Sequence, residues 1–248
     1  MSRDAWDPER YGAFSAERGR PFAELAARVR VKDPRRVVDL GCGDGRLTAT
    51  LAERWPAARV QGVDSSPAMV EAARRVPGID VVLADLAAWR PAAPVDVIVS
   101  NAALHWVPGH LDLFEHWVGA LNPGGVFAFQ VPGNFGAPSH TLLRATAEAH
   151  GVALDWPSVA EPAAYLAALT ALGCAADVWE TTYLQVLKGD DAVLAWMRGT
   201  ALRPVLAALE DPTDFLADYR TRLRGSYPPT EHGTVFPFRR IFAVARRS

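Results

Sequence analysis

The sequence predicts an α/β fold built on a doubly wound, mostly parallel sheet. Short runs of β-branched residues alternate with helix-like patterns in the first half of the chain, which is typical of parallel strands joined by right-handed crossovers. The first strand breaks into a turn with glycine at every second position, at Gly41, Gly43 and Gly45. A chain of 248 residues that is 50% hydrophobic can bury a large core, and one domain is favoured over two equal ones.

The expected elements follow this rhythm along the chain. Strands are expected near residues 36–40, 60–63, 80–84, 95–100 and 125–131. Helices are expected near residues 21–30, 45–55, 66–76 and 109–120. The sequence Asn-Pro-Gly-Gly at residues 122–125 predicts a turn that ends the fourth helix and precedes the fifth strand.

The pattern changes after residue 130. Further elements are expected at 138–150 (helix), 162–172 (helix), 176–187 (strand), 190–225 (helical block) and 238–245 (strand), with a short linker at 227–229. We expect a helical cap formed by the N-terminal segment, part of 132–172, and 190–225. The domain prediction is an N-terminal helical cap segment at residues 1–30 and a main domain at 31–248 with a helical insertion at about 190–225.

The glycine turn predicts a site for a nucleotide-like cofactor. Glycine lets the backbone turn with positive φ and approach a ligand closely, and the following helix directs free N–H groups towards it. The dinucleotide pattern G-x-G-x-x-G requires glycine at position 46, where this chain has Arg46. The alternative is that the three glycines mark an ordinary strand-to-helix turn.

An acidic residue ends the second strand, about 20 residues beyond the turn. A carboxylate in this place can accept hydrogen bonds from both hydroxyls of a ribose, which is the role we expect for Asp64. Ser66 and Pro67 are typical of a helix start, so Asp64 also suits a helix N-terminus, and the two roles are compatible. The loop after the apolar fourth strand is expected to line the reaction pocket, because such sheets bind ligands beyond the carboxyl ends of their strands.

With Asp39 on the first strand, the pattern D-x-G-x-G-x-G resembles the class I methyltransferases that use S-adenosylmethionine. The resemblance implies a Rossmann-like, seven-stranded sheet with an antiparallel final pair, and S-adenosylhomocysteine as product. It also implies that Asp85 meets the adenine amino group, with Ala84 and Leu86 beside the ring; a surface acid is the alternative for Asp85. The cofactor residues so implied are Asp39, Gly41, Cys42, Gly43, Gly45, Asp64, Ser65, Ala84, Asp85, Leu86 and Asn101.

Other segments resemble the family of methyltransferases that act on trans-aconitate. The resemblance runs through nearly the whole chain and is carried by residues 14–21, 101–108, 121–125, 199–204 and 236–247, together with Tyr11. It implies methyl esterification of one carboxylate of a small polycarboxylate. The substrate residues so implied are Tyr11, Phe14, Arg18, Trp106, Arg198, Arg203 and Arg239.

Arginine suits such a substrate because its planar guanidinium binds carboxylates bidentately. Arg20 and Arg240 are further candidates, and strand alternation allows at most one of Arg239 and Arg240 to face the substrate. The alternative for each arginine is a surface or ion-paired role.

A carboxylate is ionised at neutral pH, so the acceptor needs no general base for direct in-line methyl transfer. We therefore expect His105 to donate a hydrogen bond or to pack at the pocket mouth rather than to act as a base. Trp106 is expected to form a wall behind the cofactor or acceptor, with a core aromatic as the alternative. A phenolic acceptor would instead need a base, and His105 would then be essential.

Composition limits the other partners. The net charge of −2 disfavours nucleic acid, and no apolar run reaches the length of a membrane span. Cys42 and Cys174 cannot form a metal cluster, no metal is expected, and the polar N-terminus lacks a secretory core. We expect a cytoplasmic protein with a small-molecule substrate and infer no protein partner. The alternatives left open are another small carboxylate or phenolic acceptor, a dinucleotide-dependent oxidoreductase, and a cofactor-binding sensor without catalysis.

Overall fold

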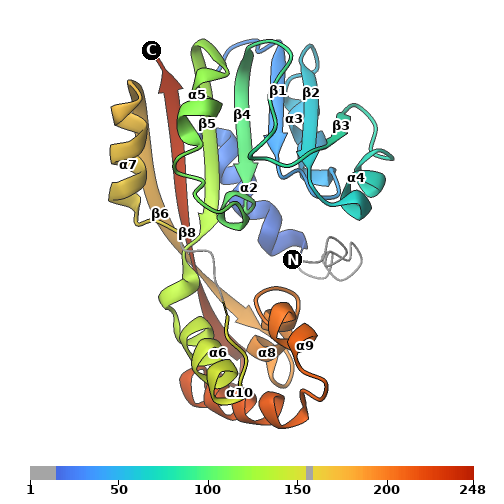
Figure 1. Cartoon of the computed structure of the whole chain (residues 1–248), viewed down its shortest axis with the longest axis vertical. Helices are drawn as coiled ribbons and strands as arrows, with labels where there is room; N and C mark the ends of the chain where they lie inside the picture. Colours follow the sequence, from blue (N-terminus) through green and yellow to red (C-terminus); the bar gives the residue numbers. More distant parts are fainter. Residues whose placement is uncertain (1–14, 155–158) are drawn as a thin grey trace. The chain divides into compact units, whose positions relative to one another are not determined.

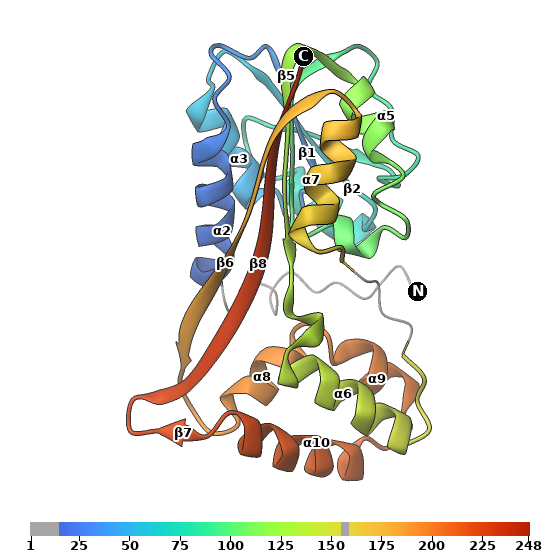
Figure 2. The same ribbon diagram turned by 90° about the vertical axis from the view of Figure 1, so that its left-hand side faces the viewer.

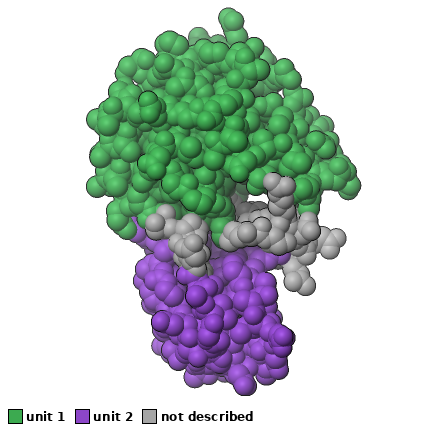
Figure 3. Space-filling model, viewed as in Figure 1, with its two compact units in different colours: residues 1–131, 159–180, 241–248 green, residues 132–158, 181–240 purple. Residues whose placement is uncertain are grey.

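The computed structural model describes residues 15–154 and 159–248, with side chains from residue 19 onward. The chain divides into two compact units (Figure 3). Unit 1 comprises residues 1–131, 159–180 and 241–248, and unit 2 comprises residues 132–158 and 181–240. The expected boundary between a cap segment at 1–30 and the remaining chain stays a prediction.

One sheet has the strand order β3-β2-β1-β4-β5-β8-β6 (Figure 1), and the short β7 pairs with β8 (Figure 2). Its first five strands pair in parallel, and β8 runs opposite to β5 and β6, so the mostly parallel fold is confirmed (Figure 1). The strands are β1 Arg36–Leu40, β2 Arg59–Asp64, β3 Asp80–Leu83, β4 Val95–Asn101, β5 Leu121–Pro132, β6 Cys174–Leu187, β7 Pro229–Thr230 and β8 Gly233–Arg247.

Helices cover both faces of the sheet in unit 1. Figure 2 shows α2 and α3 on one face and α5 and α7 on the other, which is the doubly wound arrangement. The interior positions of β1 and β4 are buried because helices cover both their faces. The helices are α2 Ser15–Arg28, α3 Arg46–Arg54, α4 Pro67–Ala73, α5 Phe114–Gly119, α6 Pro138–Ala149, α7 Pro162–Ala171, α8 Ala192–Arg198, α9 Arg203–Ala208 and α10 Thr213–Ser226, with 3₁₀ turns η1 Leu104–Trp106 and η2 Asn134–Gly136.

Two segments differ from the sequence-based prediction. Residues 122–125 belong to β5 rather than to a free turn: the register with β4 jumps from Val95–Leu121 to Val97–Val126, so the four residues bulge out of the ladder. Residues 227–229 are not a linker, because the Tyr227 ring is buried against Phe236 with ring centroids 5.4 Å apart. Local glycine and proline content could not reveal either tertiary contact.

The helices of the expected cap have different environments. Helix α7 belongs to unit 1, where Tyr165 and Leu169 are fully buried in the hydrophobic core beside the sheet. Helices α6 and α10 pack together in unit 2, where the Tyr219 hydroxyl donates to the Ser139 carbonyl (2.7 Å). Within the described parts of the chain, no helix has the length and apolar character to cross a membrane.

Candidate functional site

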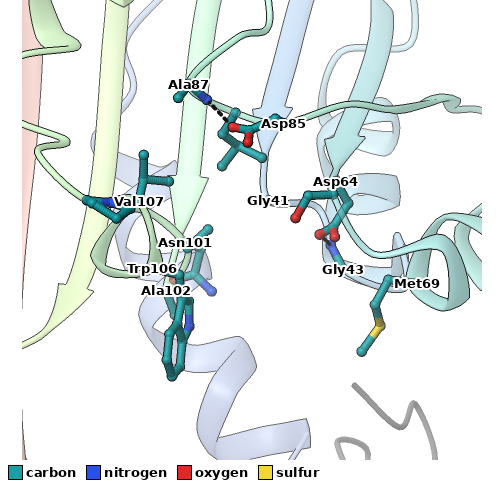
Figure 4. Close-up of a pocket in the computed structure, with 14 residues that line it drawn as sticks. Gly41, Gly43, Asp64, Met69, Asp85, Ala87, Asn101, Ala102, Trp106 and Val107 are labelled. Atoms are coloured by element: carbon teal, nitrogen blue, oxygen red, sulfur yellow. Dashed lines mark hydrogen bonds between the residues drawn. The ribbon is translucent and has the colours of Figure 1, made fainter. Parts of the chain in front are cut away.

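A pocket of about 260 Å³ lies in unit 1, beyond the carboxyl ends of β1, β2 and β4 (Figure 4). Its walls come from the glycine turn, the ends of β2 and β4, and the loops that follow β3 and β4. The described lining residues are Gly41, Gly43, Asp64, Ser65, Met69, Asp85, Leu86, Ala87, Asn101, Ala102, Ala103, Trp106, Val107 and Pro108.

The glycine turn forms the floor of this pocket. Gly41 has φ 83°, its N–H donates to the Val63 carbonyl (2.7 Å), and a Cβ there would lie 2.1 Å from the Cβ of Ala103. Gly43 has φ 56°, and a Cβ there would meet nothing within 4 Å. The first glycine is therefore required for close packing, whereas the second leaves space beside the backbone that a ligand can occupy.

Asp64 is held in place by the backbone around it. Its Oδ2 accepts from the Gly43 N–H (2.9 Å) and its Oδ1 accepts from the Ser66 N–H (2.9 Å). Figure 4 shows Gly43 beside the Asp64 carboxylate. Burial raises the pKa of Asp64, and these hydrogen bonds oppose that rise. A carboxylate has about four lone-pair sites, so Asp64 retains accepting capacity beyond these backbone donors and is preorganised to accept a diol.

Asp39 is buried behind the turn and is not among the described lining residues. Its Oδ2 accepts from the Thr48 hydroxyl (2.6 Å) on α3, and its Oδ1 has no hydrogen-bond partner within the described part of the chain. Burial raises its pKa to about 7, although the hydrogen bond from Thr48 lowers it. Its visible contact thus ties β1 to α3, and its contact with a cofactor stays a prediction.

The loop after β3 contributes Asp85 and Leu86 to the pocket. The Asp85 Oδ1 accepts from the Ala87 N–H (2.8 Å), the contact drawn in Figure 4, while Leu86 is buried. An exposed carboxylate next to an apolar side chain suits a flat heterocycle that carries an amino group.

The end of β4 contributes the remaining wall. The Asn101 Oδ1 is buried and finds no hydrogen-bond partner among the residues that the structure describes. Ala102 adopts φ 53°, which turns the chain into η1 and presents Trp106 to the pocket (Figure 4). His105 is buried, its ring centroid lies 4.7 Å from that of Trp106, and it is not among the described lining residues.

The structure thus brings most of the predicted cofactor residues together. Four predicted cofactor residues are not among the described lining residues: Asp39, Cys42, Gly45 and Ala84. Cys42 is buried in the turn and Gly45 caps α3, so both build the turn, and their direct cofactor contacts stay predictions.

The predicted substrate residues are more scattered. Tyr11, Phe14 and the side chain of Arg18 lie outside the described residues. Arg198 ends α8, Arg203 begins α9 and Arg239 lies on β8, all three in unit 2. Their roles stay predictions.

The remaining arginine candidates have visible contacts. Arg20 is exposed and pairs with Glu24 (2.8 Å). Arg240 is 6% exposed with its guanidinium 4.6 Å from the centre of the Phe238 ring, whereas Arg239 is half-buried. The two arginines therefore face opposite sides of the strand, as the alternation predicts.

Several lining residues were missed by sequence reasoning. Met69 lies one turn into α4, where the Ser66 hydroxyl accepts from its N–H (3.4 Å), so the helix start was a usable signal. Val107 and Pro108 belong to the loop after β4, which was expected to line the pocket, although the two residues were not named individually. Ala87, Ala102 and Ala103 line the pocket mainly through their position on the chain and carry no distinctive chemistry.

Comparison with known proteins agrees with this geometry. Residues 37–125, which carry the glycine turn and the pocket, match the family model described as a methyltransferase domain. The fold is similar to the YcgJ protein from Bacillus subtilis (TM-score 0.64, 15% identity, 92% of this chain and 98% of that one) and to a putative methyltransferase from Bacillus halodurans (TM-score 0.58, 16% identity, 91% and 98%). The fold and the matched domain are those of class I methyltransferases, which use S-adenosylmethionine, and close relatives of the chain are methyltransferases.

The particular family follows from closer relatives. The chain is 53% identical to trans-aconitate 2-methyltransferase from Streptomyces avermitilis over 98% of this chain and 97% of that protein, and 50% identical to the one from Mycobacterium tuberculosis over 97% and 96%. The chain therefore belongs to the trans-aconitate 2-methyltransferase family. The chain is a methyltransferase, so the alternatives of a dinucleotide-dependent oxidoreductase and of a sensor without catalysis do not hold.

Proposed function

We propose that this protein uses S-adenosylmethionine to form the monomethyl ester of trans-aconitate. One observation carries the proposal: relatives that share half of its residues over nearly the whole chain are named trans-aconitate 2-methyltransferase. The alignment covers 98% of the chain, so it includes unit 2, which carries three of the predicted substrate arginines, and is not confined to the cofactor motif.

The described residues fit the cofactor. The open space beside Gly43 admits a ligand against the backbone, and the buried Asn101 Oδ1 lacks a donor that an amino group can supply. Asp64 would accept from the ribose hydroxyls, and Asp85 from the adenine amino group with Leu86 beside the ring. Ser65 and the glycine turn complete the proposed cofactor set.

When bound, S-adenosylmethionine supplies an electrophilic methyl group on its sulfonium. The acceptor carboxylate is already ionised at neutral pH, so no side chain has to remove a proton. The position of His105, buried against Trp106, supports a packing or orienting role. The protein then contributes alignment and the exclusion of water, since attack requires the reacting atoms about 3–3.5 Å apart.

Arginines are proposed to hold the carboxylates that do not react. A bidentate Arg–carboxylate pair fixes orientation, but it also occupies the oxygen lone pairs, so the attacking carboxylate must be more weakly bound than its neighbours. The proposed acceptor residues are Tyr11, Phe14, Arg18, Trp106, Arg198, Arg203 and Arg239.

The experiment is an assay of acceptor specificity. Purified protein is incubated with cofactor that carries a ¹³C methyl group and with trans-aconitate, cis-aconitate, citrate, isocitrate or a simple phenol, and products are identified by mass spectrometry. We expect a singly labelled ester from trans-aconitate with the highest kcat/KM of the panel. A faster reaction with the phenol, or no ester from trans-aconitate, would reject the proposed acceptor.

A further inference from the structure

One wall of the pocket is a loop that contains a single 3₁₀ turn and no α-helix or strand. Residues 102–110, here called the wall loop, run from the end of β4 through η1 and supply Trp106, Val107 and Pro108 to the pocket. Its start is anchored where the Ala102 N–H donates to the Gln130 carbonyl (2.8 Å). A loop of this kind keeps one shape only where side chains tie it to rigid elements.

His110 makes such a tie at the far end of the wall loop. Its N–H donates to the Val107 carbonyl (3.2 Å), which joins it directly to the pocket-lining turn. Its Nε2 lies 2.8 Å from the hydroxyl of Tyr165, which is 55 positions further along the chain on α7. Both side chains are buried, His110 at 4% exposure and Tyr165 at 0%.

Tyr165 is itself fixed on the core side. Its ring lies beside those of Phe114 and Phe129, with centroids 6.0 Å and 5.1 Å away. Its hydroxyl accepts from the Ala160 N–H (3.2 Å) just before α7. The contact with His110 therefore joins the wall loop to a part of unit 1 that the core already holds rigid.

Burial favours the neutral form of both members of this pair. The Tyr165 hydroxyl accepts from the Ala160 N–H and can also donate its one proton to the Nε2 of His110. That direction requires a neutral imidazole with Nε2 unprotonated. Burial lowers the pKa of His110 and raises that of Tyr165 to about 12, so both groups are neutral near pH 7.

We propose that His110 and Tyr165 are positioning residues for the cofactor site: their hydrogen bond holds the wall loop in the shape that places Trp106, Val107 and Pro108 against the ligand. Neither side chain is among the described lining residues, so both act through the loop. The inference rests on the proposed function only in taking this pocket as the cofactor site. A preformed wall avoids the cost of ordering a loop on binding, so its loss weakens cofactor affinity.

The test uses substitutions that separate the hydrogen bond from the packing. Tyr165→Phe keeps the ring against Phe114 and Phe129 but removes the hydroxyl. Glutamine at position 110 can present a polar atom near the place of Nε2, whereas asparagine is too short and mimics Nδ1. We expect Tyr165→Phe and His110→Asn each to raise the Kd for S-adenosylhomocysteine about tenfold by calorimetry, with His110→Gln recovering most of the affinity.

A control separates positioning from general stability. Tyr219→Phe in unit 2 also removes a fully buried hydroxyl that donates to a backbone carbonyl, so its melting temperature should fall by a similar amount. We expect its Kd for S-adenosylhomocysteine to stay within twofold of the wild type. Combining Tyr165→Phe with His110→Asn should weaken binding little more than either change alone, because both remove the same bond.

The outcomes distinguish this inference from the proposed function. If Tyr165→Phe and His110→Asn lower the melting temperature but leave the Kd within twofold of the wild type, the pair is only structural and the inference is overturned. The same holds if His110→Gln binds no better than His110→Asn. Wild-type protein that binds S-adenosylhomocysteine but forms no ester of trans-aconitate would overturn the proposed function while this binding test still decides the inference.

Discussion

The two compact units differ in how their predicted functional residues are related to secondary structure. In unit 1, Gly41, Asp64 and Asn101 each stand at or just beyond the carboxyl end of a parallel strand, and all three line one pocket. In unit 2, Arg198 and Arg203 stand at a helix end and a helix start, and Arg239 stands inside a strand. Parallel strands bring their ends to one edge of a sheet, whereas no comparable rule brings together the ends of short helices.

This difference explains why cofactor and acceptor recognition are unequally visible in the sequence. The cofactor site uses backbone geometry and carboxylates whose positions follow from strand order, so a motif locates them. Acceptor recognition depends on side chains that tertiary packing brings together, so single arginines carry little information without the fold. Substitutions in each unit test whether Asp64 serves the cofactor and the arginines of unit 2 serve the acceptor.

The largest effect is expected for Asp64 in unit 1. Asp64→Ala removes the proposed ribose contact, and two charge-assisted hydrogen bonds of about 1.5–3 kcal/mol each would weaken S-adenosylhomocysteine binding by about 100-fold or more. Calorimetry of the variant provides the measurement. Asp80→Ala, which removes an exposed carboxylate that pairs with Arg59, is the control and should bind as the wild type does. A Kd for Asp64→Ala within threefold of the wild type would contradict the ribose role.

The next largest effect concerns His140 in unit 2 and is a dependence of stability on pH. Burial, helped by the nearby Arg144 charge, lowers the pKa of His140 to about 4 from its usual 6.5. The unfolded chain therefore takes up the proton first as pH falls, and the stability that is present above pH 6.5 is lost progressively down to about pH 4. The free energy of unfolding lost over this range through His140 is about 3 kcal/mol.

Urea unfolding between pH 4 and 7 measures this loss as a difference between variants. His140→Asn can keep a bond to the Ser139 hydroxyl, which lies 3.0 Å from Nδ1, but it does not titrate, so it should lose less stability than the wild type. The comparison between variants is needed because the raised pKa of Asp39 adds stability as pH falls through the same range, which opposes the loss at His140. His232→Asn, at a highly exposed imidazole, is the control. Equal pH slopes for His140→Asn and the wild type would show that burial does not hold this imidazole neutral.

Sequence reasoning succeeded where a local pattern determines the structure. Strand β1 was predicted at its observed bounds, and Asp64, Asp85 and Asn101 line the pocket as expected, because each follows directly from a strand end. Asp39 shows the limit of a motif: the pattern placed it correctly on β1, but only the structure shows its carboxylate turned to Thr48. A motif locates residues along the chain without stating which atoms they face.

The errors occur where contacts between distant segments determine the structure. Residues 122–125 contain turn-forming amino acids, yet the Asn122 amide donates to Asp96 (2.7 Å) and the segment stays in the sheet as a bulge. Tyr227 stands beside two prolines, yet its hydroxyl accepts from the Ser139 N–H (3.0 Å) and its ring is buried. Both outcomes depend on partners that lie 26 and 88 positions away in the chain, which a window of local sequence does not contain.

The smallest effect is expected for the arginines of unit 2, because each supplies only part of the acceptor contacts. Arg198→Met or Arg203→Met keeps an unbranched side chain but removes the guanidinium, so the KM for trans-aconitate should rise about 10- to 100-fold, as expected for about 1.5–3 kcal/mol of a charged hydrogen bond. The KM for S-adenosylmethionine should stay within twofold. Steady-state kinetics with each substrate varied in turn provides both values.

Arg222→Met is the matched control for these arginines, because Arg222 is also in unit 2 and is not a proposed acceptor residue. It pairs with Asp218 one helical turn away (2.8 Å), and such exposed pairs contribute little. Its two KM values should both match the wild type. If Arg203→Met instead raises the KM for the cofactor as much as that for trans-aconitate, the arginine does not discriminate between the substrates. The proposal that the arginines of unit 2 recognise the acceptor rather than the cofactor would then fail at this residue.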